Sequence, residues 1–307
     1  MIYTSENNWY NWQYGDQKPF GRQTGNLEFK TTYGKFSGKF YDFKTELDQT
    51  AASTLDHYPG LRPQIFFSGG VDSELILRSY INIGANPEVY IARYENDMNI
   101  HDISYAIIVC NLLGVKYNII DFNIQKFYEN DAETISDQAQ IDEPSMLPQL
   151  KFTESADGLI IVGMGDLFWT RVSDDYSQKS TWISRDFEFD NSLDKYSILH
   201  NRTAIYQWWK WSPGITLAYT KLKWFNQLIN DELQGKLGVM STKLSGFQEI
   251  YPDLMPRKKY VGFEKNKELL TEFENFIKRK NNGLIYRNEV HRTLEELLLE
   301  ITGKPKI

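Results

Sequence analysis

Residues 68–73 contain the part of this sequence whose types and spacing best suit chemistry: serine, two glycines, valine, aspartate and serine. Two consecutive glycines allow a sharp turn and a close approach of the backbone to an anion. The first N–H groups of a following helix and its dipole would attract phosphate, and the hydroxyls of Ser68 and Ser73 would add donors. Asp72 would repel phosphate unless a divalent cation lay between them. The segment therefore predicts a site for a nucleotide with Mg²⁺.

The glycine spacing distinguishes this loop from the Walker phosphate loop. That loop needs G-x-x-x-x-G-K-[ST], and no such string occurs in the chain. Residues 68–73 instead resemble the SGGxDS signature of the PP-loop ATP pyrophosphatases. In that superfamily the loop holds the β- and γ-phosphates as pyrophosphate leaves, while a substrate oxygen is adenylated. The resemblance implies ATP and Mg²⁺ as cofactors.

Apolar runs alternate with helical periods around the loop and would position it. We predict strands at residues 64–67, 88–93, 117–122 and 158–162, and helices at residues 73–83 and 102–113. This rhythm predicts right-handed crossovers and a parallel sheet covered on both faces, so the fold class is α/β with a doubly wound parallel sheet. The superfamily resemblance implies its PP-loop form, which is adenine nucleotide alpha hydrolase-like. Gly69 and Gly163 both follow strands, where open α/β sheets bind ligands.

The two ends of the chain depart from this pattern. Alternating stretches at residues 27–33 and 35–41, with a break at Gly34, predict a short aromatic cap with a β-hairpin. The last third of the chain is predicted to be mostly helical and to close with a helix over residues 289–300. We therefore expect an N-terminal cap at residues 1–55 and a PP-loop domain at residues 56–307 with a helical C-terminal part.

Two later motifs lie where they can complete a nucleotide site. Asp166, in the turn at residues 163–166, follows a strand and can face Asp72 across a shared Mg²⁺, although an aspartate there is also a common helix N-cap. Residues 257–259 form a basic loop in an acidic protein. Preorganised cations would stabilise the negative charge that develops on a triphosphate attacked at its α-phosphorus. A short basic run is otherwise typical of a solvated surface.

Together the three motifs resemble the synthetase domain of asparagine synthetases and their β-lactam synthetase relatives, over roughly residues 60–265. That domain has SGGxDS, then a strand ending in a Gly-Glu-Gly-x-Asp-Glu-like turn, then an R-x-K-x-x-F-like segment with a catalytic lysine. The implied catalytic residues are Lys259 and Arg257, with Lys258 as the alternative lysine because this loop has one extra residue. The implied ligands of Mg²⁺ are Asp72 and Asp166, and the implied nucleotide contacts are Phe66, Ser68, Gly69, Gly70, Asp72, Ser73, Ala92 and Gly163.

Three departures from the family pattern limit what can be transferred. Met164 stands where the family has a glutamate assigned to acid/base work, and a thioether cannot move a proton. Leu167 replaces a further acid, and the carboxylates at residues 142–143 or 174–175 are either substitutes or simple loop and cap acids. Glutamine-using family members have a cysteine after the initiator methionine and a long glutaminase domain. This chain has Ile2 and a short N-terminal segment, so glutaminase activity is not expected.

Composition and charge limit which classes of partner and which cellular compartment we expect for this protein. The formal net charge is −7, so general attraction to nucleic acid is not expected. Cys110 is the only cysteine, which excludes disulfides within the chain and suits a reducing cytoplasm. Its apolar neighbours predict a small buried side chain. The sequence has no 18-residue apolar run, so a membrane partner is not expected either.

The leading hypothesis is a cytoplasmic, ATP-dependent, amide-forming ligase of the asparagine synthetase type. A small-molecule carboxylate, aspartate or a similar one, would be adenylated with release of pyrophosphate. Ammonia or another amine would then capture the acyl group, and a separate partner could supply the ammonia. Two alternatives stay open. One is a PP-loop enzyme that modifies a nucleobase or tRNA, for which residues 208–211 are the one hint; the other is a non-catalytic nucleotide-binding relative, which Met164 favours.

Overall fold

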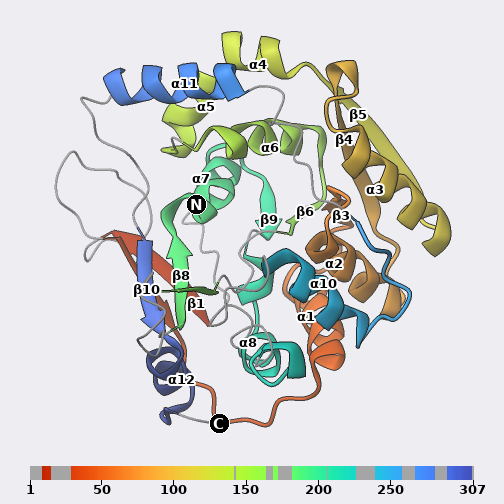
Figure 1. The fold of residues 1–307 in the computed structure, drawn as a ribbon, viewed down its shortest axis with the longest axis vertical. Helices are drawn as coiled ribbons and strands as arrows, with labels where there is room; N and C mark the ends of the chain where they lie inside the picture. The colour runs from red at the N-terminus through yellow and green to blue at the C-terminus, as the bar shows by residue number, and fades with distance from the viewer. Residues whose placement is uncertain are drawn as a thin grey trace.

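A five-stranded parallel sheet forms the centre of the protein in the computed structural model (Figure 1). The structure describes residues 9–14, 29–141, 143–163, 169–171, 182–205, 207–225, 239–257, 267–280 and 289–305. The central strands are β3 (Pro63–Phe66), β4 (Glu88–Tyr94), β5 (Tyr117–Phe122), β6 (Leu159–Val162) and β9 (Thr203–Ile205). Their order is β5-β4-β3-β6-β9, and every neighbouring pair is parallel.

Side chains of each central strand alternate between two hydrophobic cores. Ile65 and Phe67 belong to one core, whereas Phe66 packs against the other. The first core includes side chains of α1 (Phe43–His57), α2 (Val71–Asn82), α3 (Ile100–Leu113), α8 (Pro213–Tyr219), α10 (Val239–Gln248) and α12 (Leu294–Thr302). The second includes those of α4 (Ile124–Asn130), α5 (Ala132–Ala139), α6 (Leu147–Phe152), α7 (Ser192–Leu199) and α11 (Lys267–Lys280). Helices therefore cover both faces, which confirms the predicted doubly wound sheet.

The order of the strands reverses between β3 and β6. The chain moves outward from β3 through β4 to β5, then returns to the other side of β3 as β6 and continues outward to β9. At such a switch point the loops that follow the two central strands diverge to opposite faces and leave a crevice at the carboxyl ends. The turns that follow Phe66 and Val162 both lie at this point, since these residues are partners in the β3–β6 pairing.

The N-terminal β-hairpin is present, but its predicted pairing is wrong. Strand β2 (Phe29–Tyr33) pairs antiparallel with β1 (Tyr10–Tyr14), and residues 35–41 form no strand. The predicted second strand instead runs along the core as irregular chain, because Phe36 and Phe40 pack there and the Phe36 N–H donates to the carbonyl of Ile301. The alternation of residues 35–41 thus reflects two aromatic anchors rather than a pleated strand.

The predicted closing helix also begins later than expected. Residues Glu289–Thr293 form strand β10, which pairs with β8 (Trp182–Phe187) in a sheet of order β10-β8-β7, where β7 is Trp169–Arg171. Thr293 starts α12 with a capping box: its hydroxyl accepts from the Glu296 N–H, and the Glu296 carboxylate accepts from the Thr293 N–H. Such a box marks a helix start, so the chain before it is free to pair as a strand.

A buried ionic network joins the hairpin to this second sheet. The Asp186 carboxylate is fully buried and accepts from Thr31 at 2.6 Å, Tyr33 at 2.9 Å, Lys210 at 2.7 Å and Arg292 at 2.9 Å. Burial alone would raise the pKa of Asp186, but Lys210 and the other donors hold it below its ordinary value. A carboxylate so completely paired is stable when buried, and it connects four separate segments of the chain.

Most of the tryptophan cluster at residues 208–211 belongs to the core. Trp208, Trp209 and Lys210 are each at most 1% exposed, and the Trp208 indole donates to the Tyr80 hydroxyl at 3.3 Å. The half-buried Trp211 packs against the same core and contacts the rings of His57 and Tyr58. Buried rings cannot stack on the bases of an RNA, so the packing does not support the tRNA alternative. Among the described helices, none has the length and apolar character needed to cross a bilayer.

Asp194 predicts a pH dependence of folding stability. Burial raises the pKa of this carboxyl group from 3.8 to about 7, against smaller lowering effects of Trp12 and Lys195. The pKa of Asp194 is higher in the folded state than in the unfolded state. The contribution of this group to the free energy of unfolding is therefore fully present below about pH 4 and is lost as the pH rises towards 7. In urea denaturation, the wild type should lose about 1.3 kcal/mol of unfolding free energy relative to Asp194→Asn between pH 5 and 6, and about 1 kcal/mol between pH 6 and 7. Exposed Asp56→Asn is the control, and parallel profiles for wild type and Asp194→Asn would contradict the assignment.

Candidate active site

The loop between β3 and α2 has a backbone that only glycine accommodates at position 69. Gly69 has φ +79°, and a Cβ placed there would lie 2.2 Å from the carbonyl oxygen of Asp102 in α3. A left-handed backbone disfavours other residues, and the close approach of α3 excludes even a methyl group. The loop is thus pressed against the start of α3, which holds it in place.

Helix α2 begins without a side-chain cap, which leaves donors at its start. Gly70 is the N-cap, and the first helical hydrogen bond runs from the Glu74 N–H to the Gly70 carbonyl at 3.1 Å. The N–H groups of the first helical turn precede this bond and so lie outside the repeating hydrogen-bond pattern of the helix. The Ser68 and Ser73 hydroxyls lie 3.3 Å apart beside them, and a Cβ on Gly70 would lie 3.2 Å from Ser68 Oγ. This cradle of donors around a bare backbone fits a phosphate group.

The end of β6 lies directly against this cradle. A Cβ on Gly163 would lie 3.2 Å from the Cα and Cβ of Ser73, so any larger residue here would press on the start of α2. Gly163 further forms an isolated antiparallel bridge with Gln207, which follows β9. The structure therefore brings Gly163 to the start of α2, although the two lie ninety residues apart in the sequence.

Phe66 and Ala92, which the family resemblance places with Gly163 against adenine, are half-buried at the same edge of the sheet. The Phe66 ring stacks on Tyr90, with centroids 5.3 Å apart and planes at 14°. The carbonyl of Ala92 accepts a hydrogen bond from the Asn99 side chain at 2.9 Å, and Asn99 Oδ1 accepts from the Tyr94 N–H at 2.9 Å. Asn99 thus closes the turn after β4. The contact of these two residues with adenine stays a prediction.

Arg257 reaches the phosphate loop from the far end of the sequence. Its Nη1 donates to the carbonyl of Gly69 at 2.6 Å, its Nη2 forms an ion pair with Glu74, and its Nε donates to the carbonyl of Met255 at 3.3 Å. The side chain is 7% exposed and lies over the Tyr105 ring. All three nitrogens bond to protein acceptors, so Arg257 contacts the loop from its carbonyl side.

Glu74 is a site residue that the sequence analysis missed. Glu74 follows the motif directly and accepts from Arg78 Nε at 2.8 Å as well as from Arg257. Burial of the Cys110 thiol, with a smaller contribution from the nearby Glu74 charge, raises the pKa of this thiol to about 12. Cys110 is fully buried, as predicted. The spacing of Glu74 and Arg78, four residues apart in a helix, was the available signal.

The remaining predicted site residues lie outside the described part of the chain. These are Met164, Asp166, Lys258 and Lys259. Asp72 is half-buried in the first turn of α2. Within the described residues no three carboxylate, histidine or cysteine side chains come together, so the Mg²⁺ site stays a prediction that depends on Asp166. Glu143 accepts from the Ser145 hydroxyl at 2.9 Å and forms no capping bond to the short helix that follows it.

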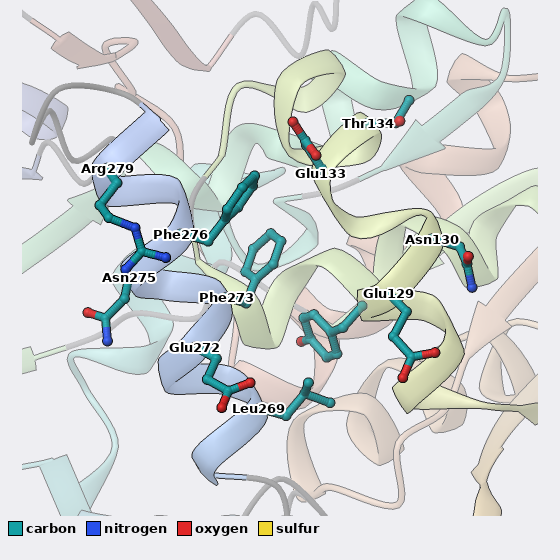
Figure 2. A pocket seen from close by; sticks show the side chains of 11 residues that line it. Glu129, Asn130, Glu133, Thr134, Leu269, Glu272, Phe273, Asn275, Phe276 and Arg279 are labelled. Atoms are coloured by element: carbon teal, nitrogen blue, oxygen red, sulfur yellow. The ribbon is translucent and has the colours of Figure 1, made fainter.

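A cavity of about 560 Å³ lies elsewhere, between α4, α5 and α11. Figure 2 shows Phe273 and Phe276 of α11 on one side and Glu129 and Glu133 on the other. Its lining includes one arginine, Arg279, against three glutamates. This excess of negative charge opposes a triphosphate, and none of the predicted site residues lines the cavity.

Comparisons with known proteins give distant structural similarities. No family model matches the chain, and no curated protein matches it. An NMN synthetase from Francisella tularensis is 16% identical with a TM-score of 0.31, over 71% of this chain and 98% of the other. An NH3-dependent NAD synthetase from Campylobacter jejuni subsp. jejuni, in complex with nitrate, is 13% identical with a TM-score of 0.31, over 78% and 94%. A glutamine-dependent NAD+ synthetase from Acinetobacter baumannii, in complex with ADP, is 12% identical with a TM-score of 0.33, over 85% of this chain and 51% of the other. Similarity this weak carries no inference about activity, so function is inferred from the chain's own residues.

Proposed function

We propose that this protein is an ATP-dependent ligase that adenylates a carboxylate and converts it to an amide. The observation that carries the proposal is the loop at the switch point of the sheet. There the Gly69–Gly70 turn, the uncapped start of α2 and the hydroxyls of Ser68 and Ser73 form one cradle against Gly163. Donors arranged in this way at the end of a central strand suit the phosphates of a nucleotide.

The proposed reaction has two steps. The substrate carboxylate attacks the α-phosphorus of ATP, the α–β phosphoanhydride bond breaks, and pyrophosphate leaves into the cradle at residues 68–73. Ammonia or another amine then attacks the acyl carbon, loses a proton, and releases AMP as the amide forms. The cradle holds the leaving group, and Lys259, or Lys258 in its place, stabilises the charge that develops. Mg²⁺, held by Asp72 and Asp166, would neutralise phosphate charge when bound.

The nature of the carboxylate is the part of the proposal that needs a direct screen. The family resemblance favours aspartate, with free ammonia or a separate ammonia-supplying protein as the nitrogen source. The panel also includes carboxylate precursors of NMN and NAD, the compounds named for the three synthetases above.

ATP–pyrophosphate exchange is the experiment that tests the proposed activity. Labelled pyrophosphate should enter ATP only when the correct carboxylate is present, and adding ammonium should then yield AMP and an amide in equal amounts. Exchange that requires a nucleobase or tRNA instead of a carboxylate would show that the adenylated substrate belongs to that class. Calorimetric binding of MgATP without exchange for any carboxylate would identify a non-catalytic relative and refute the ligase.

A further inference from the structure

Four alternating charges connect α2 to the segment that contains Arg257. In α2, Glu74 and Arg78 are four residues apart; in the segment at residues 251–257, Asp253 and Arg257 are also four apart. Glu74 pairs with Arg257, and Arg78 pairs with Asp253 at 2.9 Å. Glu74 and Arg78 also pair with each other at 2.7 Å. The Glu74 side chain is 1% exposed, so its two ion pairs act in a medium that screens charge weakly.

The bond from Arg257 to Gly69 determines which way one peptide of the loop faces. The Gly69–Gly70 peptide is trans, since none of the described peptides is cis, and a planar trans peptide directs its C=O and N–H to opposite sides. With the carbonyl held by the guanidinium at 2.6 Å, the Gly70 N–H points away from Arg257 and towards Ser68 Oγ, 3.3 Å away. Two glycines in succession would otherwise let this peptide rotate easily.

A cation on the carbonyl also strengthens the donor at the other end of the peptide. A guanidinium bonded to a carbonyl oxygen draws electron density along the amide, and hydrogen-bonded groups polarise one another in a weakly screening medium. Arg257 can therefore favour an anion at the Gly70 N–H without contacting it.

We propose that Glu74 is a positioning residue: it holds the Arg257 guanidinium on the Gly69 carbonyl and so keeps the Gly70 N–H on the opposite side of the loop, beside Ser68 Oγ, where the phosphates would bind. The inference rests on the proposed nucleotide site and adds to it a residue that touches neither nucleotide nor substrate. Without Glu74, Arg257 would lose its counter-ion, and its remaining contacts are two carbonyl groups, of Gly69 and Met255.

The test is the Kd of the full-length protein for MgATP, measured by calorimetry, with the melting temperature recorded without nucleotide. Glu74→Gln and Arg257→Met should each weaken MgATP binding about tenfold, the usual effect of losing one charge-assisted hydrogen bond. The double variant should be no weaker than either single variant, because both changes remove the same interaction. Arg257→Lys, which keeps the charge and one donor, should recover part of the affinity.

Arg78→Met is the matched control. Arg78 shares the Glu74 carboxylate and is similarly buried, but it does not bond to the loop. Its loss should lower the melting temperature and change the Kd for MgATP less than about threefold. Equal weakening by Arg78→Met and Glu74→Gln, or additive effects in the double variant, would show a merely structural role and overturn the proposal.

The readout separates this inference from the proposed activity. A wild type that binds MgATP but forms no amide would refute the ligase and leave the positioning test intact. A wild type that forms amide, with Glu74→Gln binding MgATP normally, would refute the positioning role alone. If Glu74→Gln does not fold, the MgATP affinities of Arg257→Met and Arg257→Lys test the positioning role in its place. An unchanged affinity in Arg257→Met would overturn the proposal.

Discussion

Gly69→Ala is expected to weaken MgATP binding on the order of a hundredfold, the cost of misaligning two or more hydrogen bonds to phosphate. The new methyl group would lie 2.2 Å from the Asp102 carbonyl oxygen, in a residue whose φ is +79°. The clashing atom belongs to the backbone of Asp102, so no change of side-chain rotamer can relieve the contact. The loop must therefore move away from α3. The N–H groups at the start of α2 would then lose their alignment. Isothermal calorimetry with MgATP measures the effect.

Gly60→Ala is the matched control for this prediction. Gly60 has a similar φ of +83°, but nothing lies within 4 Å of a Cβ placed there. It should therefore show the strain of a left-handed alanine, about 1–2 kcal/mol of stability, without loss of nucleotide affinity. Unchanged MgATP affinity in Gly69→Ala would mean that this loop does not contact the nucleotide.

Lys259→Ala is expected to lower carboxylate-dependent pyrophosphate release on the order of a hundredfold or more. The physical reason is the loss of a preorganised cation from the region where the transition state accumulates negative charge. The measurement is the initial rate at saturating MgATP and carboxylate, because a charge that acts mainly in the transition state changes kcat more than binding.

Two further variants interpret this result. Exposed Lys267→Ala, at the start of α11, removes a lysine of the same charge outside the predicted motif and should keep the wild-type rate. Lys258→Ala distinguishes the two adjacent candidates. A large loss of rate in Lys258→Ala, with a normal rate in Lys259→Ala, would assign the catalytic role to Lys258. Normal rates in both variants would show that neither lysine is catalytic.

The sequence predicted best the features that depend on neighbours along the chain. The alternation of apolar runs and helical periods located β3, α2, β4, α3, β5 and β6 to within about two residues at each end, the usual precision of such boundaries. The two glycines at 69 and 70 predicted a tight turn, and the structure shows the close contact with α3 that requires Gly69. The doubly wound order follows from right-handed crossovers between parallel strands.

What could not be predicted depends on partners far apart in sequence. Arg257 and Glu74 are separated by 183 residues, and no periodic pattern signals that they meet. The pairing of β1 with β2 passed unnoticed because residues 35–41 show the same alternation as a strand. The cluster at residues 208–211 shows the same limit: its composition suits either a stacking surface or a core, and only the packing decides.

A crystal structure with a non-hydrolysable ATP analogue and Mg²⁺ is the most direct test of the central claim, that residues 68–73 bind the phosphates of ATP. The account predicts β- and γ-phosphate oxygens within hydrogen-bond distance of the N–H groups at the start of α2 and of the Ser68 and Ser73 hydroxyls. It also predicts Arg257 still bonded to the Gly69 carbonyl. An analogue bound elsewhere, with this loop empty, would contradict it.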